Sequence, residues 1–97
     1  MRTPDIYQES IDQNKVRELR RKFGLRQSDM SDIMGFEVKD RICHWERGRA
    51  CPGLINLIKL CILFQVQPQE LYPDLYRQIS AEIEERRVSV LLARNAT

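Results

Sequence analysis

The sequence predicts an all-α protein, with a compact domain of four to five short helices followed by an additional C-terminal amphipathic helix. Apolar residues recur at helical spacing in successive short segments, and three of these segments end at a glycine. The two-residue alternation that is typical of strands is nowhere sustained. At 97 residues, the chain is long enough for one core and a short appended element.

The first three predicted helices each end at a glycine, which adopts the left-handed conformation of a helix end at low cost. Their apolar faces and final glycines are Val16, Leu19 and Phe23 before Gly24; Met30, Ile33 and Met34 before Gly35; and Ile42 and Trp45 before Gly48. Each face is a narrow stripe. Such stripes are buried only when the helices pack around one shared core, so we expect Trp45 to be a core residue.

Two more short helices complete the predicted domain. The fourth follows Pro52, and a single turn with Pro68 at its first position is the fifth. The apolar face of the fourth helix consists of Leu54, Leu57, Leu60, Cys61 and Phe64. We therefore expect a domain at residues 14–72, preceded by an N-terminal arm at 1–13.

Residues 73–97 are expected to form a C-terminal helix and tail. Leu75, Ile79 and Ile83 alternate with charged residues and lead into the apolar stretch 88–92, which is the pattern of an amphipathic helix. The last four residues and the first dozen carry little structural signal. We expect both ends to be loose or ordered by a partner.

The composition argues against a membrane protein and against a secreted one. No run approaches the roughly 20 apolar residues of a membrane helix, and the first residues lack the apolar core of a signal peptide. Three cysteines form no CxxC pair, so we expect reduced thiols and neither a disulfide framework nor a zinc site. We expect no membrane association and a cytoplasmic location.

An enzyme would need a nucleophile with a base, paired carboxylates or a metal cluster. The single histidine, His44, has no triad-like company, and the group of Cys43, His44 and Cys51 lacks a fourth metal ligand. The sequence therefore predicts no catalytic residue, no metal site and no cofactor.

Positive charge is unevenly distributed, although the net charge is only +2. Between Lys15 and Arg26 the chain has six basic residues and one acid, Glu18. Such a run is typical either of a solvated helix face or of a surface that binds phosphate. Arg20, Arg21 and Lys22 form the centre of the run, and both interpretations stay open for them.

The segment from Gly24 to Leu60 reads GLRQSDMSDIMGFEVKDRICHWERGRACPGLINLIKL. It resembles the lambda-repressor-like (Xre/Cro-type) helix-turn-helix DNA-binding family, and the resemblance covers residues 14–72. Its most specific elements are Gly24-Leu25 with Gln27, the small Ser31, Gly35, the run 45–48, Pro52 and the leucines of the fourth helix. The ordered set carries the resemblance, since each element is common by itself.

The resemblance implies that the third helix, at about 38–47, lies in the DNA major groove with side chains near its start at base edges. By position, the implied base contacts are Lys39, Asp40, Arg41 and His44. The implied phosphate contacts are Arg26, Gln27, Arg47, Arg49 and Lys59. Ser31 is small enough for the second and third helices to cross closely, and Gly35 permits the turn between them.

The chain departs from the family pattern at three places. The stretch GFEVKDRICHW is one residue longer than the common spacing, so we expect an enlarged turn before the third helix. If the turn does not take up the whole insertion, the assigned positions of the third helix shift by one residue. Arg26 and Gly53 stand where a serine or threonine usually caps the following helix. Glu37 and Asp40 place negative charge near the DNA, which lowers non-specific affinity or favours contacts to cytosine.

The expected function is therefore that of a transcriptional regulator, acting as a repressor, which binds a specific double-stranded operator and is nucleoid-associated. A homodimer joined by the C-terminal helix would read an inverted repeat, whereas the other interpretation folds this helix back over the first and fifth helices. An alternative function is an antitoxin-type autoregulator that also binds a partner protein through its C-terminal helix. A further alternative is a cofactor protein that binds no DNA.

Overall fold

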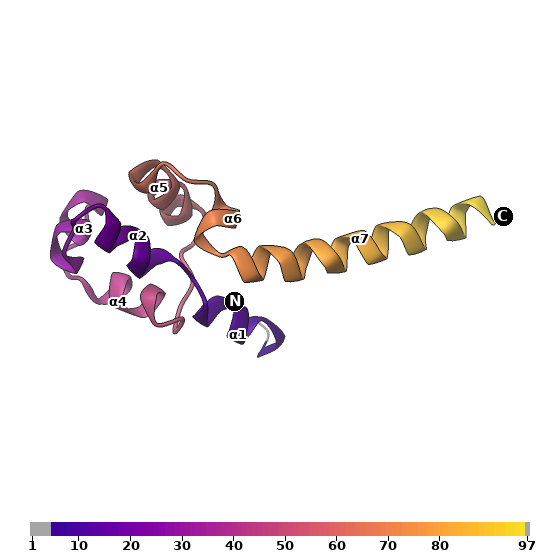
Figure 1. The fold of residues 1–97 in the computed structure, drawn as a ribbon, viewed down its shortest axis with the longest axis horizontal. Coiled ribbons are helices and arrows are strands. Elements are labelled where there is room, and N and C mark those ends of the chain that lie inside the picture. Colours follow the sequence, from indigo (N-terminus) through magenta and orange to yellow (C-terminus); the bar gives the residue numbers. More distant parts are fainter. Residues whose placement is uncertain (1–4, 97) are drawn as a thin grey trace.

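The structure is a computed structural model, and it describes residues 5–96 (Figure 1). The elements in order are η1 (Asp5–Tyr7), α1 (Gln8–Asp12), α2 (Val16–Lys22), α3 (Gln27–Met34), α4 (Asp40–Glu46), α5 (Leu54–Phe64), α6 (Pro68–Leu71) and α7 (Pro73–Asn95). Within residues 5–96 every regular element is a helix. The all-α fold class is confirmed, and α2 to α6 are the five short helices that the sequence predicts.

The core is built from one face of each short helix. Its fully buried side chains include Val16 of α2, Met30 of α3, Ile42 of α4, Leu60 of α5 and Leu71 of α6. These are the positions at which the apolar spacing of each segment predicted a buried stripe. The shared core places α3 and α4 side by side, with α2 packed against α4.

Trp45 is a core residue, as the sequence predicted. Only 3% of its surface is exposed, and its ring meets that of Phe36 edge to face, with 5.8 Å between the ring centroids. This contact joins α4 to the turn that precedes it. Trp45 is therefore unavailable for stacking on a base.

The N-terminal arm differs from the expectation. Residues 5–12 are helical, and Ile11 of α1 is buried in the core, so this part of the arm is not loose. Asn14 fixes the connection to α2, because its side-chain amide donates to the carbonyls of Ile11 (2.8 Å) and Trp45 (2.9 Å). A five-residue helix with one buried residue is too short to produce a readable period, which is why the sequence pattern missed it.

The C-terminal helix α7 leaves the domain and projects into solvent (Figure 1). It begins at Pro73, whose fixed φ suits a first helical position, and it contains no buried residue. The radius of gyration is 16.5 Å, compared with about 13 Å for a compact chain of this length. The structure therefore does not fold α7 back over α2 and α6, and the tail that we expected to be loose is helical as far as Asn95. Thr97, its last residue, lies outside the described residues.

Candidate nucleic-acid interface

The turn between α3 and α4 is held from inside by a serine hydroxyl. Gly35 takes φ +83°, a conformation that favours glycine, and ends α3. The buried Ser31 hydroxyl then donates to the carbonyl oxygen of Val38 at 2.8 Å. The sequence predicted Ser31 for its small size alone, whereas the hydroxyl also stabilises the turn between α3 and α4. Residues 35–39 thus form the turn, and α4 begins at Asp40.

The exposed side of α4 carries the residues expected at base edges. Ile42 and Trp45 turn towards the core, which leaves the other side of this short helix in solvent. The exposed residues there are Lys39, Asp40, Arg41 and His44, with Lys39 at the N-cap position. The structure therefore brings the four candidates together on one accessible face. Cys43 lies between them and is half-buried.

Arg47 and Arg49 follow directly at the end of α4, and both are exposed. Between them Gly48 takes φ +73°, and the amide of Arg49 donates to the carbonyl of His44 at 2.9 Å. This closure ends α4 and leaves the two arginine side chains on the outside. They remain accessible to a polyanion beside the exposed face of α4.

Arg26 precedes α3 and is exposed, in agreement with the expectation that no serine-type cap is present. An arginine side chain has no hydrogen-bond acceptor, so it cannot cap the first amides of a helix. The reverse contact forms instead, because the Arg26 amide donates to the Asp29 carboxylate at 2.8 Å. The Asp29 carboxylate therefore stabilises the start of α3 in place of a serine-type cap. The guanidinium of Arg26 takes no part in this contact, and Arg26 is exposed to solvent.

Glu46 is a buried carboxylate that the sequence did not single out. Its side chain is wholly buried at the end of α4, where Arg20 of α2 donates from Nε to Oε2 at 2.6 Å and from Nη2 to Oε1 at 3.2 Å. Arg17 Nε also donates to Glu46 Oε1, at 3.3 Å, and Gln27 Nε2 of α3 donates to the same oxygen at 3.2 Å. One carboxylate thus connects α2, α3 and α4.

Burial by itself would raise the pKa of Glu46, yet the net effect of this cluster is the opposite. Hydrogen bonds from Arg20, Gln27 and Arg17 stabilise the charged form and hold the pKa of the Glu46 carboxyl below its ordinary value. The carboxylate is therefore ionised at neutral pH. Because Gln27 is a donor in this cluster, its amide already has a partner inside the protein.

Arg17 and Arg20, two residues of the basic run between Lys15 and Arg26, pair with Glu46 in this cluster. Arg20 is buried and paired, so neither interpretation offered for it is right, because it is neither solvated nor open to phosphate. The Arg17 guanidinium also turns towards Glu46, although half of its side chain is exposed. Arg21 and Lys22 remain exposed. The surface charge of α2 is therefore smaller than the sequence suggests.

Lys59 of α5 and Arg41 of α4 both lie near the ring of the turn residue Phe36. Lys59 Nζ donates to the carbonyl of Met34 at 3.1 Å, near the end of α3, and lies 5.8 Å from the centre of the Phe36 ring. The guanidinium of Arg41 lies 4.9 Å from the same ring centre. Both cations are thus held by the protein. Contact of Lys59 with phosphate would compete with its bond to the α3 carbonyl.

Neither a membrane span nor a metal cluster occurs in the part of the chain that the structure describes. No helix there is long and apolar enough to cross a membrane. No three or more His, Cys, Asp or Glu side chains lie close enough together to hold a metal ion.

Comparisons with known proteins agree with this geometry. A helix-turn-helix family model, HTH_3, matches residues 16–71. An HTH-type transcriptional regulator of Bacillus subtilis (strain 168), YgzD, is 29% identical over 59 residues, which are 61% of this chain and 88% of that protein. The crystal structure of the restriction-modification controller protein C.AhdI from Aeromonas hydrophila has a TM-score of 0.55 at 28% identity, and the match covers 66% of this chain and 97% of that one. Because the family model spans α2 to α6 and more than half of the chain, this protein belongs to the helix-turn-helix family.

Proposed function

We propose that this protein is a transcriptional repressor that binds a specific operator in double-stranded DNA as a homodimer, with α4 in the major groove. Membership of the helix-turn-helix family supports a DNA-binding regulator rather than an enzyme. The observation that carries the proposal is the exposed face of α4, where Lys39, Asp40, Arg41 and His44 are all exposed to solvent. Repression is the simplest action, because a protein bound at an operator excludes polymerase from the same DNA.

The four residues on α4 offer different chemistry to base edges. Lys39 and Arg41 can donate to guanine, Asp40 can accept from cytosine, and His44 can do either according to its protonation. Asp40 stands in the first turn of α4, and its negative charge disfavours random phosphate contact. We therefore expect moderate non-specific affinity and a marked preference for particular base pairs.

We assign phosphate contacts to the exposed cations around that face, Arg26, Arg47 and Arg49. Gln27 and Lys59 stay in the proposal as weaker contacts, because each already bonds within the protein, to Glu46 and to Met34. A phosphate contact from either residue would exchange one hydrogen bond for another. We place the protein in the cytoplasm, associated with the nucleoid.

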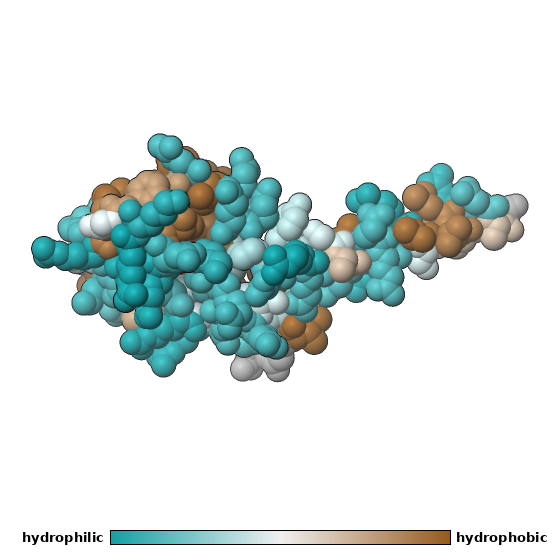
Figure 2. All heavy atoms as spheres, in the orientation of Figure 1, coloured by the Kyte–Doolittle hydropathy of each residue, from teal (hydrophilic) through white to brown (hydrophobic). Residues whose placement is uncertain are grey.

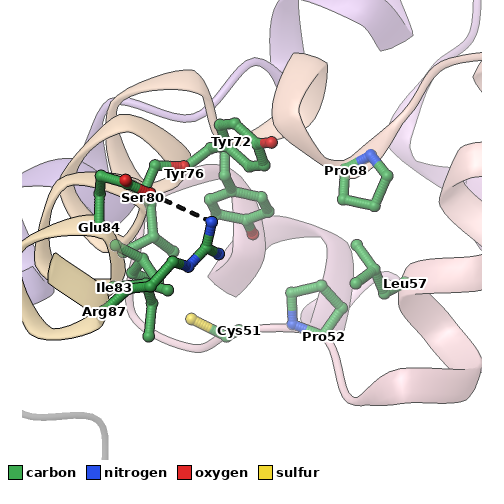
Figure 3. A pocket seen from close by; sticks show the side chains of 12 residues that line it. Cys51, Pro52, Leu57, Pro68, Tyr72, Tyr76, Ser80, Ile83, Glu84 and Arg87 are labelled. Carbon is green, nitrogen blue, oxygen red and sulfur yellow. Dashed lines mark ion pairs between the residues drawn. The ribbon is translucent and has the colours of Figure 1, made fainter. Parts of the chain in front are cut away.

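For the dimer we propose α7 as the contact and residues 14–72 as the DNA-binding domain, with 1–13 as the arm. Three large apolar side chains of α7, Tyr76, Ile79 and Ile83, are exposed and line a groove of about 460 Å³ beside Pro52 (Figure 3). The groove ends at Arg87, which pairs with Glu84 at 3.3 Å. These exposed apolar side chains lie along one helix and give a partner helix apolar surface to pack against.

A second apolar surface competes with α7 for this role. Figure 2 shows hydrophobic surface over α5, where Leu54, Ile55 and Ile62 are each about 70% exposed and Ile58 is about half exposed. Double substitutions to lysine, made in the full chain, distinguish the α7 surface from the α5 surface. If α7 makes the dimer, Ile79→Lys with Ile83→Lys yields monomers in sedimentation, whereas Ile58→Lys with Ile62→Lys does not. The reverse result would move the dimer contact to α5.

The antitoxin-type alternative is supported by the far end of α7. Figure 2 shows a hydrophobic patch there, and Val88, Val90, Leu91 and Leu92 are exposed. A partner protein could bind this end while α4 regulates the operon of both proteins. A second small protein that co-purifies from the native host, and is lost on Leu91→Lys with Leu92→Lys, would support this function.

Selection of bound sites from random duplex DNA tests the main proposal. We expect an inverted repeat whose half-site centres lie about one helical turn, or a multiple of it, apart. Affinity for the selected site should fall with salt, with a logarithmic slope of about 0.9 for each phosphate contact. A random pool that yields no enriched sequence, together with a flat salt response, would contradict DNA binding.

A further inference from the structure

The N-terminal segment η1–α1 contacts both α7 and the end of α4. On the α7 side, the Tyr7 hydroxyl donates to Glu82 Oε2 at 2.7 Å, and the Ser10 hydroxyl donates to Gln78 Oε1 at 2.6 Å. Gln78 Nε2 donates back to the carbonyl of Ile6 at 2.8 Å. The bond to Glu82 also raises the pKa of the Tyr7 phenol, as expected for a donor to a carboxylate.

Other side chains of the same segment contact the turn after α4. Gln8 Nε2 donates to the carbonyl of Gly48 at 2.7 Å. A Cβ added at Gly48 would come within 2.9 Å of the Asp12 Cα, so the end of α1 packs directly on this turn. Ile11, between these contacts, is buried in the core. Figure 1 shows α1 beside the first turns of α7.

The orientation of α7 depends on such lateral contacts. α7 has no fully buried residue, and beyond its connection at Tyr72 and Pro73 only Leu75 in its first turn is partly buried against the core. A helix of 23 residues is about 34 Å long, so a change of about 10° at its base moves its far end by about 6 Å, close to two base-pair steps of DNA. A small change of angle in α7 is therefore large on the scale of an operator.

We propose that the segment η1–α1 is a strut that fixes the angle between α7 and α4 and thereby determines which half-site spacing the protein accepts. The inference rests on the proposed homodimer that is joined through α7. Within such a dimer, the partner is fixed to α7 and the bases are read by α4. The strut connects α7 to the end of α4. Tyr7 and Gln8 are then positioning residues for specificity, although neither lies on the exposed face of α4.

Operators with altered spacing test the strut. The two half-sites recovered by selection are joined through spacers from two base pairs shorter to two longer, and the affinity of each duplex is measured. Glu82→Ala removes the acceptor for Tyr7, and Gln8→Ala cuts the other end of the strut. Glu85→Ala is the matched control, because Glu85 is an exposed glutamate of the same helix.

We expect Glu82→Ala and Gln8→Ala each to reduce the preference for the best spacer about fivefold, as for one lost hydrogen bond. The base preference within a half-site should stay unchanged, and Glu85→Ala should behave as the wild type. If the wild type prefers one spacer and both variants keep its spacer profile, the strut inference is wrong and the proposed function stands. If the wild type shows no spacer preference, the α7 dimer and the strut both fail.

Discussion

Arg20 and Glu46 form a buried ion pair that joins α2 to the end of α4, with 2.6 Å between Arg20 Nε and Glu46 Oε2. The Glu46 side chain is wholly buried, and that of Arg20 is 10% exposed. Ile42 and Trp45, the core residues of α4, precede Glu46 in the same short helix. The pair therefore anchors one side of α4, so that its exposed face points in a fixed direction.

Removal of one partner should destabilise the domain strongly. Arg20→Met leaves the Glu46 carboxylate buried without its main donor, and breaking a buried pair in this way costs about 3–5 kcal/mol. Urea unfolding followed by the fluorescence of Trp45, the single tryptophan, measures the change. Arg21→Met, at the exposed neighbouring position, should change the free energy of unfolding by about 0.5 kcal/mol or less. Equal effects of both substitutions would contradict the structural role of Arg20.

The same pair gives the stability a defined dependence on pH. The pKa of Glu46 lies below its ordinary value near 4.5 in the folded chain, so between those two pKa values the unfolded chain binds more protons. The contribution of Glu46 is therefore complete above the ordinary pKa and is lost as the pH falls through the lowered one. We expect the free energy of unfolding to decrease as the pH is lowered through this acid range, and to decrease less in Glu46→Gln. A profile identical in the two proteins would show that Glu46 is not the group responsible.

The sequence predicted the helices of the domain because apolar residues recur at helical spacing and glycines end the first three. It assigned the buried faces too broadly, since Phe23, Ile33 and Leu54 are exposed. Ile42 and Trp45 fix the buried side of α4, and the exposed candidates follow from that assignment. The same logic fails for Arg20 and Glu46. Charged residues are exposed by default, and a pair 26 positions apart in the chain has no sequence spacing that would reveal it.

Two other features lay outside what the pattern could predict. The role of the Ser31 hydroxyl depends on where the carbonyl of Val38 lies, which is a property of the folded turn. The strut formed by η1–α1 consists of polar contacts between residues 40 or more positions apart, such as Gln8 with Gly48 and Tyr7 with Glu82. Tertiary contacts, rather than local propensity, fix the position of both features.

Tyr72 offers a prediction of the opposite sign to that for Arg20. Its hydroxyl is buried and has no hydrogen-bond partner in the described structure, and burial raises the pKa of its phenol far above the ordinary value. A buried polar group without a partner costs about 1–3 kcal/mol. Tyr72→Phe should therefore leave the free energy of unfolding unchanged or raise it by about 1 kcal/mol, measured by urea unfolding. Tyr72→Ala, which empties the site, should cost about 3–5 kcal/mol by analogy with other aromatic truncations. A loss of stability in Tyr72→Phe would show that the hydroxyl has a partner.

The last prediction separates base recognition from backbone positioning. Lys39 is exposed at the N-cap position of α4, so Lys39→Ala should relax the preference at one or two base pairs and cost about 1–3 kcal/mol on the specific site. Non-specific binding should fall much less. Gln27→Ala should instead weaken specific and random DNA by similar factors and keep the selected sequence, because Gln27 is at the start of α3 and its proposed contact is with the phosphate backbone, which carries no sequence information.

Because Gln27 also donates to Glu46, its variant must be measured at a temperature at which unfolding is negligible, with the folded fraction checked by Trp45 fluorescence. Site selection is then repeated with each variant. If Lys39→Ala keeps the selected sequence while Asp40→Ala or Arg41→Ala changes it, the enlarged turn at 35–39 has moved the reading register by one residue towards the C-terminus. Arg41 would then have to leave the ring of Phe36, where its guanidinium lies 4.9 Å from the centre. If none of the substitutions at Lys39, Asp40, Arg41 and His44 alters the sequence preference, α4 does not read the bases, and the proposed role of its exposed face is wrong.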